Sequence, residues 1–236
     1  RQIQKQLEDL KNAESARKEF TANVSHELKT PLMSISGYAE LMMNGMVPQD
    51  KMQDFSGRIY HESERLSNLV ADIIQLSRLD EKNGETMFEP VDLGELGEDV
   101  INNLQNRAAK KKIRLEYTGD SAQIQGVRHV LYEMFYNLTD NAIRYTPEGG
   151  EVKVFVGKLN GKPYFRVEDN GIGIPENEQQ RIFERFYRVD KSHSRETGGT
   201  GLGLSIVKHG AALHHAKILL DSEPGRGTKM EILFKN

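Results

Sequence analysis

Apolar residues recur every three or four positions through the first third of the chain, which is the spacing of an amphipathic helix. One such series spans residues 20–46 and a second spans residues 52–76. Between the two series, Gly45, Pro48 and Asp50 provide the signals that end one helix, turn the chain and begin the next. The pattern therefore predicts two long antiparallel helices, each with a single apolar stripe.

A lone helical hairpin cannot cover both of these stripes, whereas two hairpins packed as a four-helix bundle can. Ahead of the hairpin, Ile3, Leu7 and Leu10 have the spacing of a coiled coil and predict the end of an incoming helix over residues 1–14. We therefore expect a homodimer that forms through residues 1–80.

The chain changes character after residue 80. Residues 81–90 are polar and contain one glycine and one proline, which is typical of a linker. From Val91 onward helical and strand patterns alternate, and Asn160-Gly161 between two strand patterns predicts a tight hairpin turn. The helical patterns cover residues 95–110, 127–144, 176–186 and 202–213, and the strand patterns cover 113–117, 151–157, 163–168, 217–221 and 228–234. Because these elements do not form regular βαβ units, the sequence predicts an α+β sandwich with helices on one face of a mixed sheet.

Composition narrows the possible functions. The 236 residues include 32 lysines and arginines and 35 acidic residues, and the net charge of −3 argues against direct binding of nucleic acid. The absence of cysteine excludes thiol nucleophiles, disulfides and zinc held by cysteine. The sequence has neither an apolar run long enough to span a membrane nor a signal peptide. Because the first residue is Arg1 instead of methionine, we expect a fragment of a longer protein.

One histidine of the first helix is placed for chemistry. On a helical wheel, His26 lies about 180° from the centre of the apolar stripe, where an imidazole has no packing role. Glu27 is its neighbour, Thr30 lies one turn further on the same face, and Pro31 then removes a backbone N–H from the helix. A neutral imidazole beside a carboxylate can act as a nucleophile near neutral pH, and a nearby hydroxyl can orient a water. The arrangement suits a phosphoryl-histidine bond, and a solvated surface histidine is the alternative.

Two asparagines define a second site. Asn137 and Asn141 are four residues apart, so both amides project from one face of a helix, and Glu133 lies one turn earlier on that face. Asparagine is a mediocre helix former, and amide oxygens at this spacing can ligate a hard cation such as Mg²⁺. An ordinary polar surface is the alternative.

The segment from Asp169 to Pro175 (DNGIGIP) directly follows a strand pattern. Its glycines permit close backbone approach and positive φ angles. The Asp169 carboxylate at the strand end can accept a hydrogen bond from an exocyclic amine such as that of adenine. Taken alone, the motif is weak, because any tight exit from a strand uses aspartate and glycine.

The segment from Gly198 to Leu204 (GGTGLGL) leads into a helical pattern. Glycine-rich backbone at the start of a helix offers free N–H groups and a positive dipole end to phosphate. The chain contains no P-loop, and these glycines do not follow a strand in a βαβ unit, which argues against a dinucleotide fingerprint. Residues 187–197 are polar without apolar periodicity, which is typical of a mobile lid, and Phe183 and Phe186 before them are expected to be packing anchors.

In this order the motifs resemble those of bacterial two-component sensor histidine kinases. The matching segments are HELKTP at 26–31, NLTDNA at 137–142, DNGIGIP at 169–175, FERFYRVD at 183–190 and GGTGLGLSIV at 198–207. The likeness covers about residues 15–234 and is close to the phosphate-regulon and cell-wall-regulating sensor kinases of Gram-positive bacteria. The resemblance implies a dimerisation and histidine-phosphotransfer hairpin over residues 15–80, the linker over 81–90 and a Bergerat-type (GHKL) ATP-binding domain over 91–236.

The resemblance also implies a role for each matching residue of the hairpin. His26 corresponds to the phosphoacceptor, and Glu27 corresponds to the acidic residue that assists autophosphorylation. Thr30 corresponds to the polar residue that positions water when a phosphorylated response regulator is dephosphorylated.

In the second domain the resemblance implies binding of ATP and Mg²⁺. Asn137 matches a Mg²⁺ ligand, with Glu133 as a second candidate, and Asp169 matches the acceptor of the adenine amine. The other matching ATP-binding residues are Asn141 and Arg144 near the phosphates, Tyr145 near the adenine, Gly171 and Gly173 in the adenine pocket, Arg188 and Lys191 on the lid, Gly199, Gly201 and Gly203 at its hinge, and Thr200 and Leu202 between those glycines.

Two places depart from the family pattern. Many relatives have a Gly-Asp pair where this chain has Gly126-Val127, and many have a His-Gly-Gly turn where it has His214-His215-Ala216. Neither place carries assigned chemistry, so the departures concern local loop shape.

The implied function is ATP-dependent autophosphorylation of His26, followed by phosphoryl transfer to an aspartate of a response-regulator receiver domain and, through Thr30, its dephosphorylation. A membrane is expected only through segments outside this chain, which would make it the cytoplasmic portion of a membrane-anchored bacterial protein. One alternative is a regulatory dimer that binds ATP without transferring it, although such a protein would not need HELKT on a solvent face. A coiled-coil adaptor is a further alternative, but it leaves the second domain unexplained.

Overall fold

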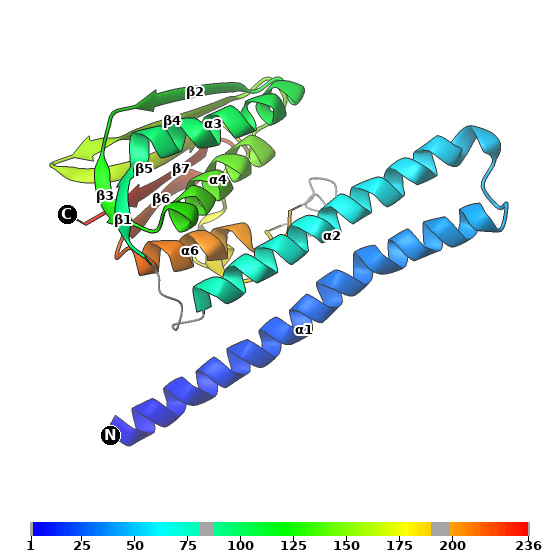
Figure 1. The fold of residues 1–236 in the computed structure, drawn as a ribbon, viewed down its shortest axis with the longest axis horizontal. Helices are drawn as coiled ribbons and strands as arrows, with labels where there is room; N and C mark the ends of the chain where they lie inside the picture. The colour runs from blue at the N-terminus through cyan, green and yellow to red at the C-terminus, as the bar shows by residue number, and fades with distance from the viewer. Residues whose placement is uncertain (1, 81–86, 190–198, 236) are drawn as a thin grey trace. The chain divides into compact units, whose positions relative to one another are not determined.

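The computed structural model describes residues 2–80, 87–189 and 199–235. The chain divides into two compact units, one made mainly of residues 1–74 and the other mainly of residues 75–236. The first unit is helical, and the second combines helices with β-sheet (Figure 1).

Two long helices form the first unit. Helix α1 spans Gln2–Met43 and helix α2 spans Met52–Asp80, with a 3₁₀ turn, η1, at Gln49–Lys51 between them. Helix α1 continues through Pro31 without ending there. The two helices confirm the pair that the apolar spacing predicts.

Helix α1 ends in a Schellman motif. Gly45 is left-handed, with φ at +67°, and its N–H donates to the Met42 carbonyl, while the N–H of Met46 donates to the Leu41 carbonyl. These two bonds satisfy carbonyls at the helix end, and glycine takes the left-handed conformation without strain. The predicted stop signal at Gly45 is therefore confirmed, together with its physical cause.

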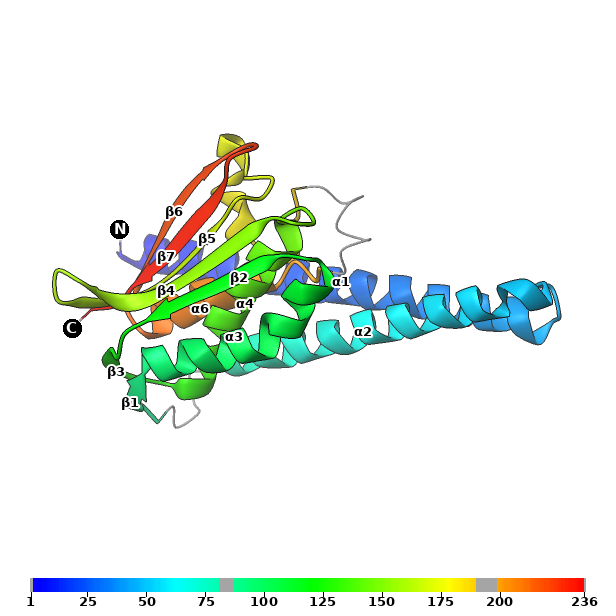
Figure 2. The same ribbon diagram turned by 90° about the horizontal axis from the view of Figure 1, so that it is seen from above.

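The second unit is a sheet covered on one face by helices. Helices α3 (Leu93–Lys110), α4 (Arg128–Tyr145) and α6 (Gly203–Leu213) lie on the same side of the sheet (Figure 1 and Figure 2). The strands are β1 (Glu89–Asp92), β2 (Arg114–Gly119), β3 (Gln123–Gly126), β4 (Glu151–Leu159), β5 (Lys162–Asp169), β6 (Lys217–Glu223) and β7 (Gly227–Leu233). The main sheet has the order β2-β4-β5-β7-β6, with β2 parallel to β4 and the other pairs antiparallel, and β1 pairs with β3 separately. This mixed sheet with helices on one face confirms the predicted α+β class.

Alternating apolar residues of the strands build the core under the helices. Val152 and Val154 of β4 and Phe165 of β5 are buried, and Phe135 of α4 stacks on Phe165 with ring centroids 3.7 Å apart. Side chains two residues apart along a strand point to the same face, so one face of the sheet supplies the core. This packing fixes α4, the helix that carries the predicted asparagine site, against the sheet.

The hairpin between β4 and β5 turns as predicted. Asn160 and Gly161 have φ angles of +52° and +80°, which is the pair of left-handed residues that a type I′ turn requires. The local sequence therefore sets the turn and, through it, the pairing of the two strands.

The prediction of a helix over residues 176–186 is wrong. The segment forms two 3₁₀ turns, η2 at Glu176–Glu178 and η3 at Arg181–Phe183. Nε2 of Gln179, between the two turns, donates to the Ser222 carbonyl on β6 at 2.9 Å. Tertiary contacts of this kind override a local helical preference.

Two short strands were not predicted. Strand β1 includes Glu89 and Pro90, which the sequence assigns to the linker, and it pairs with β3. Each strand has four residues, of which Val91 in β1 and Gly126 in β3 are buried, so neither strand shows a full alternation of apolar residues. The rest of the predicted linker lies largely outside the described residues.

Candidate functional site

The predicted phosphoacceptor lies on the solvent side of α1. The His26 side chain is 78% exposed, and its Nδ1 lies 3.8 Å from Oε1 of Glu27. At this distance the carboxylate faces Nδ1 without a hydrogen bond, and the opposite ring nitrogen, Nε2, is available to an incoming electrophile. The exposure that the helical wheel predicts for His26 is confirmed.

The Glu27 carboxylate also faces the second helix of the hairpin. Its Oε2 lies 3.6 Å from Nη2 of Arg65 on α2, and Nη1 of Arg65 lies 3.6 Å from Glu62 Oε2. Arg65 was missed from the sequence because apolar spacing does not give the register in which α1 and α2 face each other.

Thr30 lies one turn after His26, as predicted. Its Oγ1 donates to the His26 carbonyl at 3.2 Å, so the hydroxyl is held along the helix surface. The lone pairs of a threonine hydroxyl remain acceptors while its proton is donated, which leaves a contact for a water molecule.

Helix α4 presents Asn137 to the start of α6. Nδ2 of Asn137 donates to the Glu133 carbonyl at 2.8 Å, which fixes the amide and leaves Oδ1 as an acceptor. A Cβ on Gly203 would lie 2.6 Å from this Oδ1, so glycine is required where α6 begins. Asn141, one turn further along α4, is partly buried. The structure therefore brings the asparagine helix and the glycine-rich segment together.

The start of α6 presents backbone N–H groups. The N-cap residue, Leu202, has no side-chain group that caps the helix, and the first turn carries no acidic residue. Gly201 has φ at +75°, and a Cβ there would lie 2.9 Å from the backbone of Phe186, whose N–H donates to the Gly201 carbonyl. A helix N-terminus beside Asn137 with no acidic residue in its first turn favours an anion such as phosphate.

The predicted lid lies partly within the described residues. Arg188 is partly buried, Lys191 lies outside the described residues, and Gly199 and Thr200 resume the described chain. Phe183 packs against the core, as predicted. Phe186, which was predicted on a helix, is instead left-handed with φ at +63°.

Asp169 ends β5 with one carboxylate oxygen engaged. Its Oδ1 accepts hydrogen bonds from the N–H groups of Gly171 at 2.9 Å and Thr228 at 3.2 Å, while Oδ2 has no hydrogen bond within the described part of the chain. Burial raises the pKa of the Asp169 carboxyl, and the two N–H groups oppose that shift. A partly buried carboxylate with one engaged oxygen can accept a hydrogen bond from an amine. Thr228 was missed, because it lies on a distant strand with no local signal.

Glycines allow three segments to meet beside Asp169. A Cβ on Gly171 would lie 2.6 Å from the Tyr145 carbonyl at the end of α4. Gly173 has φ at +69°, and a Cβ there would overlap the Glu223 carbonyl at the end of β6. The N–H of Ile172 donates to the Tyr145 carbonyl at 3.2 Å, so the exposed Tyr145 lies next to the loop that Asp169 begins.

Arg144 belongs to an ion-pair network between α3 and α4. Its Nη2 donates to Asp140 Oδ2 at 2.8 Å, and Nη1 of Arg107 lies 2.6 Å from Asp140 Oδ1. Lys111 donates to the carbonyls of Ile143 and Arg144 at the end of α4, and burial together with the two neighbouring arginines lowers the pKa of Lys111. Nε and Nη1 of Arg144 are buried without a hydrogen-bond partner in the described part of the chain. Arg144 therefore retains two donors, while Asp140, which was missed, fixes its position.

The donors around Asn137 fit a magnesium ion that also binds phosphate. Mg²⁺ prefers oxygen ligands and keeps several of its waters, so it needs few protein ligands when a polyphosphate is present. Asn137 Oδ1 and the nearby Glu133 are donors of this type. Within residues 2–80, 87–189 and 199–235 there is no cluster of three acidic or histidine side chains that would hold a metal ion alone.

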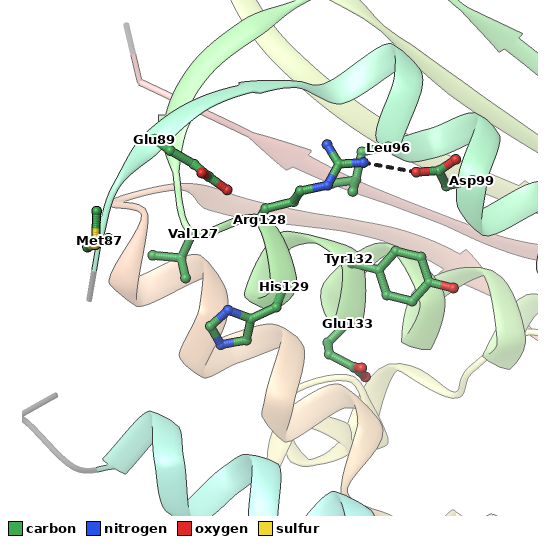
Figure 3. Close-up of a pocket in the computed structure, with 9 residues that line it drawn as sticks. All are labelled: Met87, Glu89, Leu96, Asp99, Val127, Arg128, His129, Tyr132 and Glu133. Carbon is green, nitrogen blue, oxygen red and sulfur yellow. Dashed lines mark hydrogen bonds and ion pairs between the residues drawn. The ribbon is translucent and has the colours of Figure 1, made fainter. Parts of the chain in front are cut away.

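A separate cavity of about 600 Å³ opens near the start of α4 (Figure 3). Its lining residues are Met87, Glu89, Leu96, Asp99, Val127, Arg128, His129, Tyr132 and Glu133. Arg128 and Asp99 form an ion pair of 2.9 Å across part of this wall. Of the predicted ATP-binding and metal residues, Glu133 alone lines the cavity, so it is distinct from the site at Asp169.

The fold and these sites define a class of protein that has a helical hairpin with an exposed histidine and an α/β sandwich with a glycine-lined loop at Asp169. Residues 16–82 match the family model for the His Kinase A (phospho-acceptor) domain. Residues 126–236 match the model for histidine kinase-, DNA gyrase B-, and HSP90-like ATPases.

Individual relatives agree with the two family models. Sensor-like histidine kinase SenX3 of Mycolicibacterium smegmatis is 38% identical over 218 residues, which cover 91% of this chain and 56% of that protein. The structure of the mycobacterial sensor histidine kinase MprB is 30% identical, with a TM-score of 0.55, over 62% of this chain and 96% of that chain. The structure of histidine kinase ThkA in complex with the response regulator TrrA is 22% identical, with a TM-score of 0.74, over 95% of this chain and 63% of that chain.

The chain belongs to the sensor histidine kinases. It spans about half the length of the curated relatives that it matches. In the part of the chain that the structure describes, no helix combines the length and the apolar character needed to cross a membrane.

Proposed function

We propose that this chain is an ATP-dependent protein-histidine kinase, in which His26 takes the γ-phosphoryl group of ATP and passes it to an aspartate of a response regulator. The observation that carries the proposal is an exposed imidazole flanked by a carboxylate, in a chain whose residues 126–236 match an ATPase family model. Membership of the sensor histidine kinases supports the same reaction.

The chemistry at His26 follows from the position of Glu27. Oε1 of Glu27 faces Nδ1 of the ring, so Nε2 is the nitrogen that attacks phosphorus. As the Nε2–phosphorus bond forms, the bond from the γ-phosphorus to the bridging oxygen breaks and ADP leaves. The Glu27 carboxylate takes the proton from Nδ1, which prevents a positive charge from remaining on the ring. Catalysis of this type relies mainly on positioning and on neutralising the phosphate charge.

The second unit holds the nucleotide from both ends. The adenine amine donates to Oδ2 of Asp169, and the phosphates lie against the start of α6 at Gly203. Asn137 and Asn141 face the phosphates, and Arg144 offers its two unpaired donors to them. Asn137 Oδ1, with Glu133, would hold a Mg²⁺ ion, which would neutralise phosphate charge there. The lid predicted over residues 187–203 would cover the bound nucleotide, and part of it lies outside the described residues.

The hairpin supports two kinds of partner. Apolar side chains of α1 and α2 stay exposed on the single chain, among them Leu32, Met33, Leu41, Val70 and Ile74. A second copy would cover such side chains in a four-helix bundle formed through residues 1–80. In the complex of ThkA with TrrA a histidine kinase binds a response regulator, and a receiver domain is the corresponding partner of this chain.

Labelling with ATP tests the proposal. The full chain incubated with γ-labelled ATP should acquire label that is lost in acid and stable in alkali, as for phosphohistidine. Replacing His26 with glutamine should abolish the label and leave binding of a fluorescent ATP analogue unchanged. Label that persists in His26→Gln contradicts the assignment of the acceptor. A wild-type chain that binds the analogue but never acquires label is a nucleotide-binding regulator instead.

A further inference from the structure

We propose that Arg65 is a positioning residue for autophosphorylation, which holds the Glu27 carboxylate in the orientation that faces Nδ1 of His26. The proposal rests on the kinase function above and adds to it a residue from the opposite helix of the hairpin.

The two oxygens of Glu27 face two different groups. Oε1 lies 3.8 Å from Nδ1 of His26, and Oε2 lies 3.6 Å from Nη2 of Arg65. Consecutive residues of an α-helix project about 100° apart, so Glu27 does not face His26 by virtue of the helix alone. A contact on the far side of the carboxylate is therefore needed to select the rotamer in which Oε1 approaches the ring.

Arg65 is itself fixed by a neighbour on α2. Its Nη1 lies 3.6 Å from Oε2 of Glu62, three residues earlier on the same helix. A guanidinium is planar and presents donors in a rigid fork, so one arm can face Glu62 while the other faces Glu27. The result is a chain of contacts from Glu62 through Arg65 and Glu27 to His26.

These contacts contribute more to orientation than to folding. The Arg65 side chain is 12% exposed and Glu27 is 26% exposed, but a separation of 3.6 Å is longer than a hydrogen bond, so each pair adds little to stability. The reaction depends far more steeply on geometry, because a misplacement of about 1 Å can lower a rate about 100-fold. Loss of Arg65 should therefore reduce the rate of autophosphorylation while the hairpin remains folded.

The initial rate of His26 labelling, measured on the full chain over a range of ATP concentrations, tests the proposal. Arg65→Gln should lower the maximal rate about 10- to 100-fold and leave the half-saturating ATP concentration unchanged. Arg65→Lys, which keeps the charge but lacks the fork, should recover part of the rate. The matched control is Arg58→Gln, because Arg58 is an α2 arginine paired with Asp54 at 3.1 Å, away from Glu27, and its loss should leave the rate unchanged.

A double substitution separates orientation of Glu27 from any other effect. In a Glu27→Gln background, Arg65→Gln should cause no further loss of rate, because Arg65 acts through the carboxylate. An unchanged rate in Arg65→Gln, an equal loss in both backgrounds, or a change in the half-saturating ATP concentration would each overturn the proposal. If Arg65→Gln does not fold, the same comparison with Arg65→Lys decides between these outcomes. A wild-type chain that acquires no label on His26 would overturn the kinase function instead.

Discussion

The two units of the molecule differ in how closely their residues are packed. In the first unit the His26 imidazole is exposed, its contacts with Glu27 and through Glu27 to Arg65 are 3.6 to 3.8 Å long, and a Cβ on Gly37 or Gly57 would meet open space. Around Asp169 the glycines stand where a side chain would overlap the backbone, as at Gly173. The role proposed for His26 requires it to reach both a nucleotide and a partner, which tolerates movement, whereas the nucleotide site proposed at Asp169 must hold one shape.

Burial shifts the pKa values of charged groups in the second unit. In the second unit burial raises the pKa of Asp169 and lowers the pKa of His214. Each shift makes the stability of the folded unit depend on pH, and the two dependences have opposite signs. Substitutions at these residues therefore test the rigid half of the comparison, and substitutions in α1 test the tolerant half.

The largest effect is expected at Gly173. Alanine there would be left-handed and would overlap the Glu223 carbonyl, so Gly173→Ala should cost about 3–5 kcal/mol of unfolding free energy and abolish ATP binding. Chemical denaturation and a fluorescent ATP analogue measure the two losses. The control is Gly225→Ala in the adjoining turn, where φ is +78° but no atom lies near the added Cβ. Equal costs for the two substitutions would show that backbone conformation, and not the close contact, makes the site rigid.

The next effect is expected at Asp169, where binding and stability should change in opposite directions. Asparagine keeps an acceptor for the Gly171 and Thr228 N–H groups but offers an amide toward the nucleotide. Asp169→Asn should weaken ATP binding about 10- to 100-fold, as expected for the loss of a charged hydrogen bond. Titration calorimetry with ATP measures this loss, and unchanged affinity would remove Asp169 from the adenine site.

The same variant should be more stable than the wild type near neutral pH. Because burial raises the pKa of Asp169 in the folded state, the folded chain binds the proton more tightly than the unfolded chain does. Wild-type stability therefore falls as pH rises from the ordinary aspartate pKa of about 3.9 to the raised one, and the penalty persists above it. Asparagine carries no such penalty. Thermal melts should show the advantage of Asp169→Asn at pH 7 and its disappearance near pH 4, whereas a constant gap would contradict the linkage.

A smaller effect is expected at His214, where the substitution should lower stability near neutral pH instead of raising it. The His214 side chain caps the start of α4. Val127 at the start of α4 provides no side-chain cap, and its N–H donates instead to Nε2 of His214 at 2.9 Å. Nδ1 of His214 lies 2.8 Å from the Gly210 carbonyl, so the buried ring accepts at one nitrogen and donates at the other. Phenylalanine would keep the ring but leave the Val127 N–H unpaired. His214→Phe should therefore cost about 1–3 kcal/mol.

Acidification should narrow the difference in stability between the wild type and His214→Phe. Since burial lowers the pKa of His214, the unfolded chain binds the proton more readily, and wild-type stability falls as pH drops below the ordinary histidine pKa of about 6.5. The gap between wild type and His214→Phe in thermal melts should be larger at pH 8 than at pH 5. His61→Gln, at an exposed histidine of α2, is the control and should change neither melt. A gap that does not depend on pH would show that His214 is not held in the neutral form.

Features that depend on local sequence could be predicted, whereas contacts between distant elements could not. The two helices, the turn at Gly45 and the exposure of His26 follow from local spacing and local turn chemistry, and they were predicted correctly. Arg65 and Thr228 were missed because their contacts depend on the register between distant elements. The prediction of a helix over residues 176–186 is wrong for the same reason, since a contact with β6 determines the conformation of this segment.

The smallest effects are expected from two substitutions, one that removes a glycine from the first unit and one that adds a glycine to the second. Gly37 lies inside α1 with open space around it, so Gly37→Ala should raise the unfolding free energy by about 0.5–1 kcal/mol. His215 is left-handed with φ at +51°, so His215→Gly should relieve strain and raise the unfolding free energy by up to about 1 kcal/mol. Denaturant titration measures both changes. Loss of stability in Gly37→Ala would show that a second chain covers this face of α1, and the tolerant unit would then be as closely packed as the rigid one.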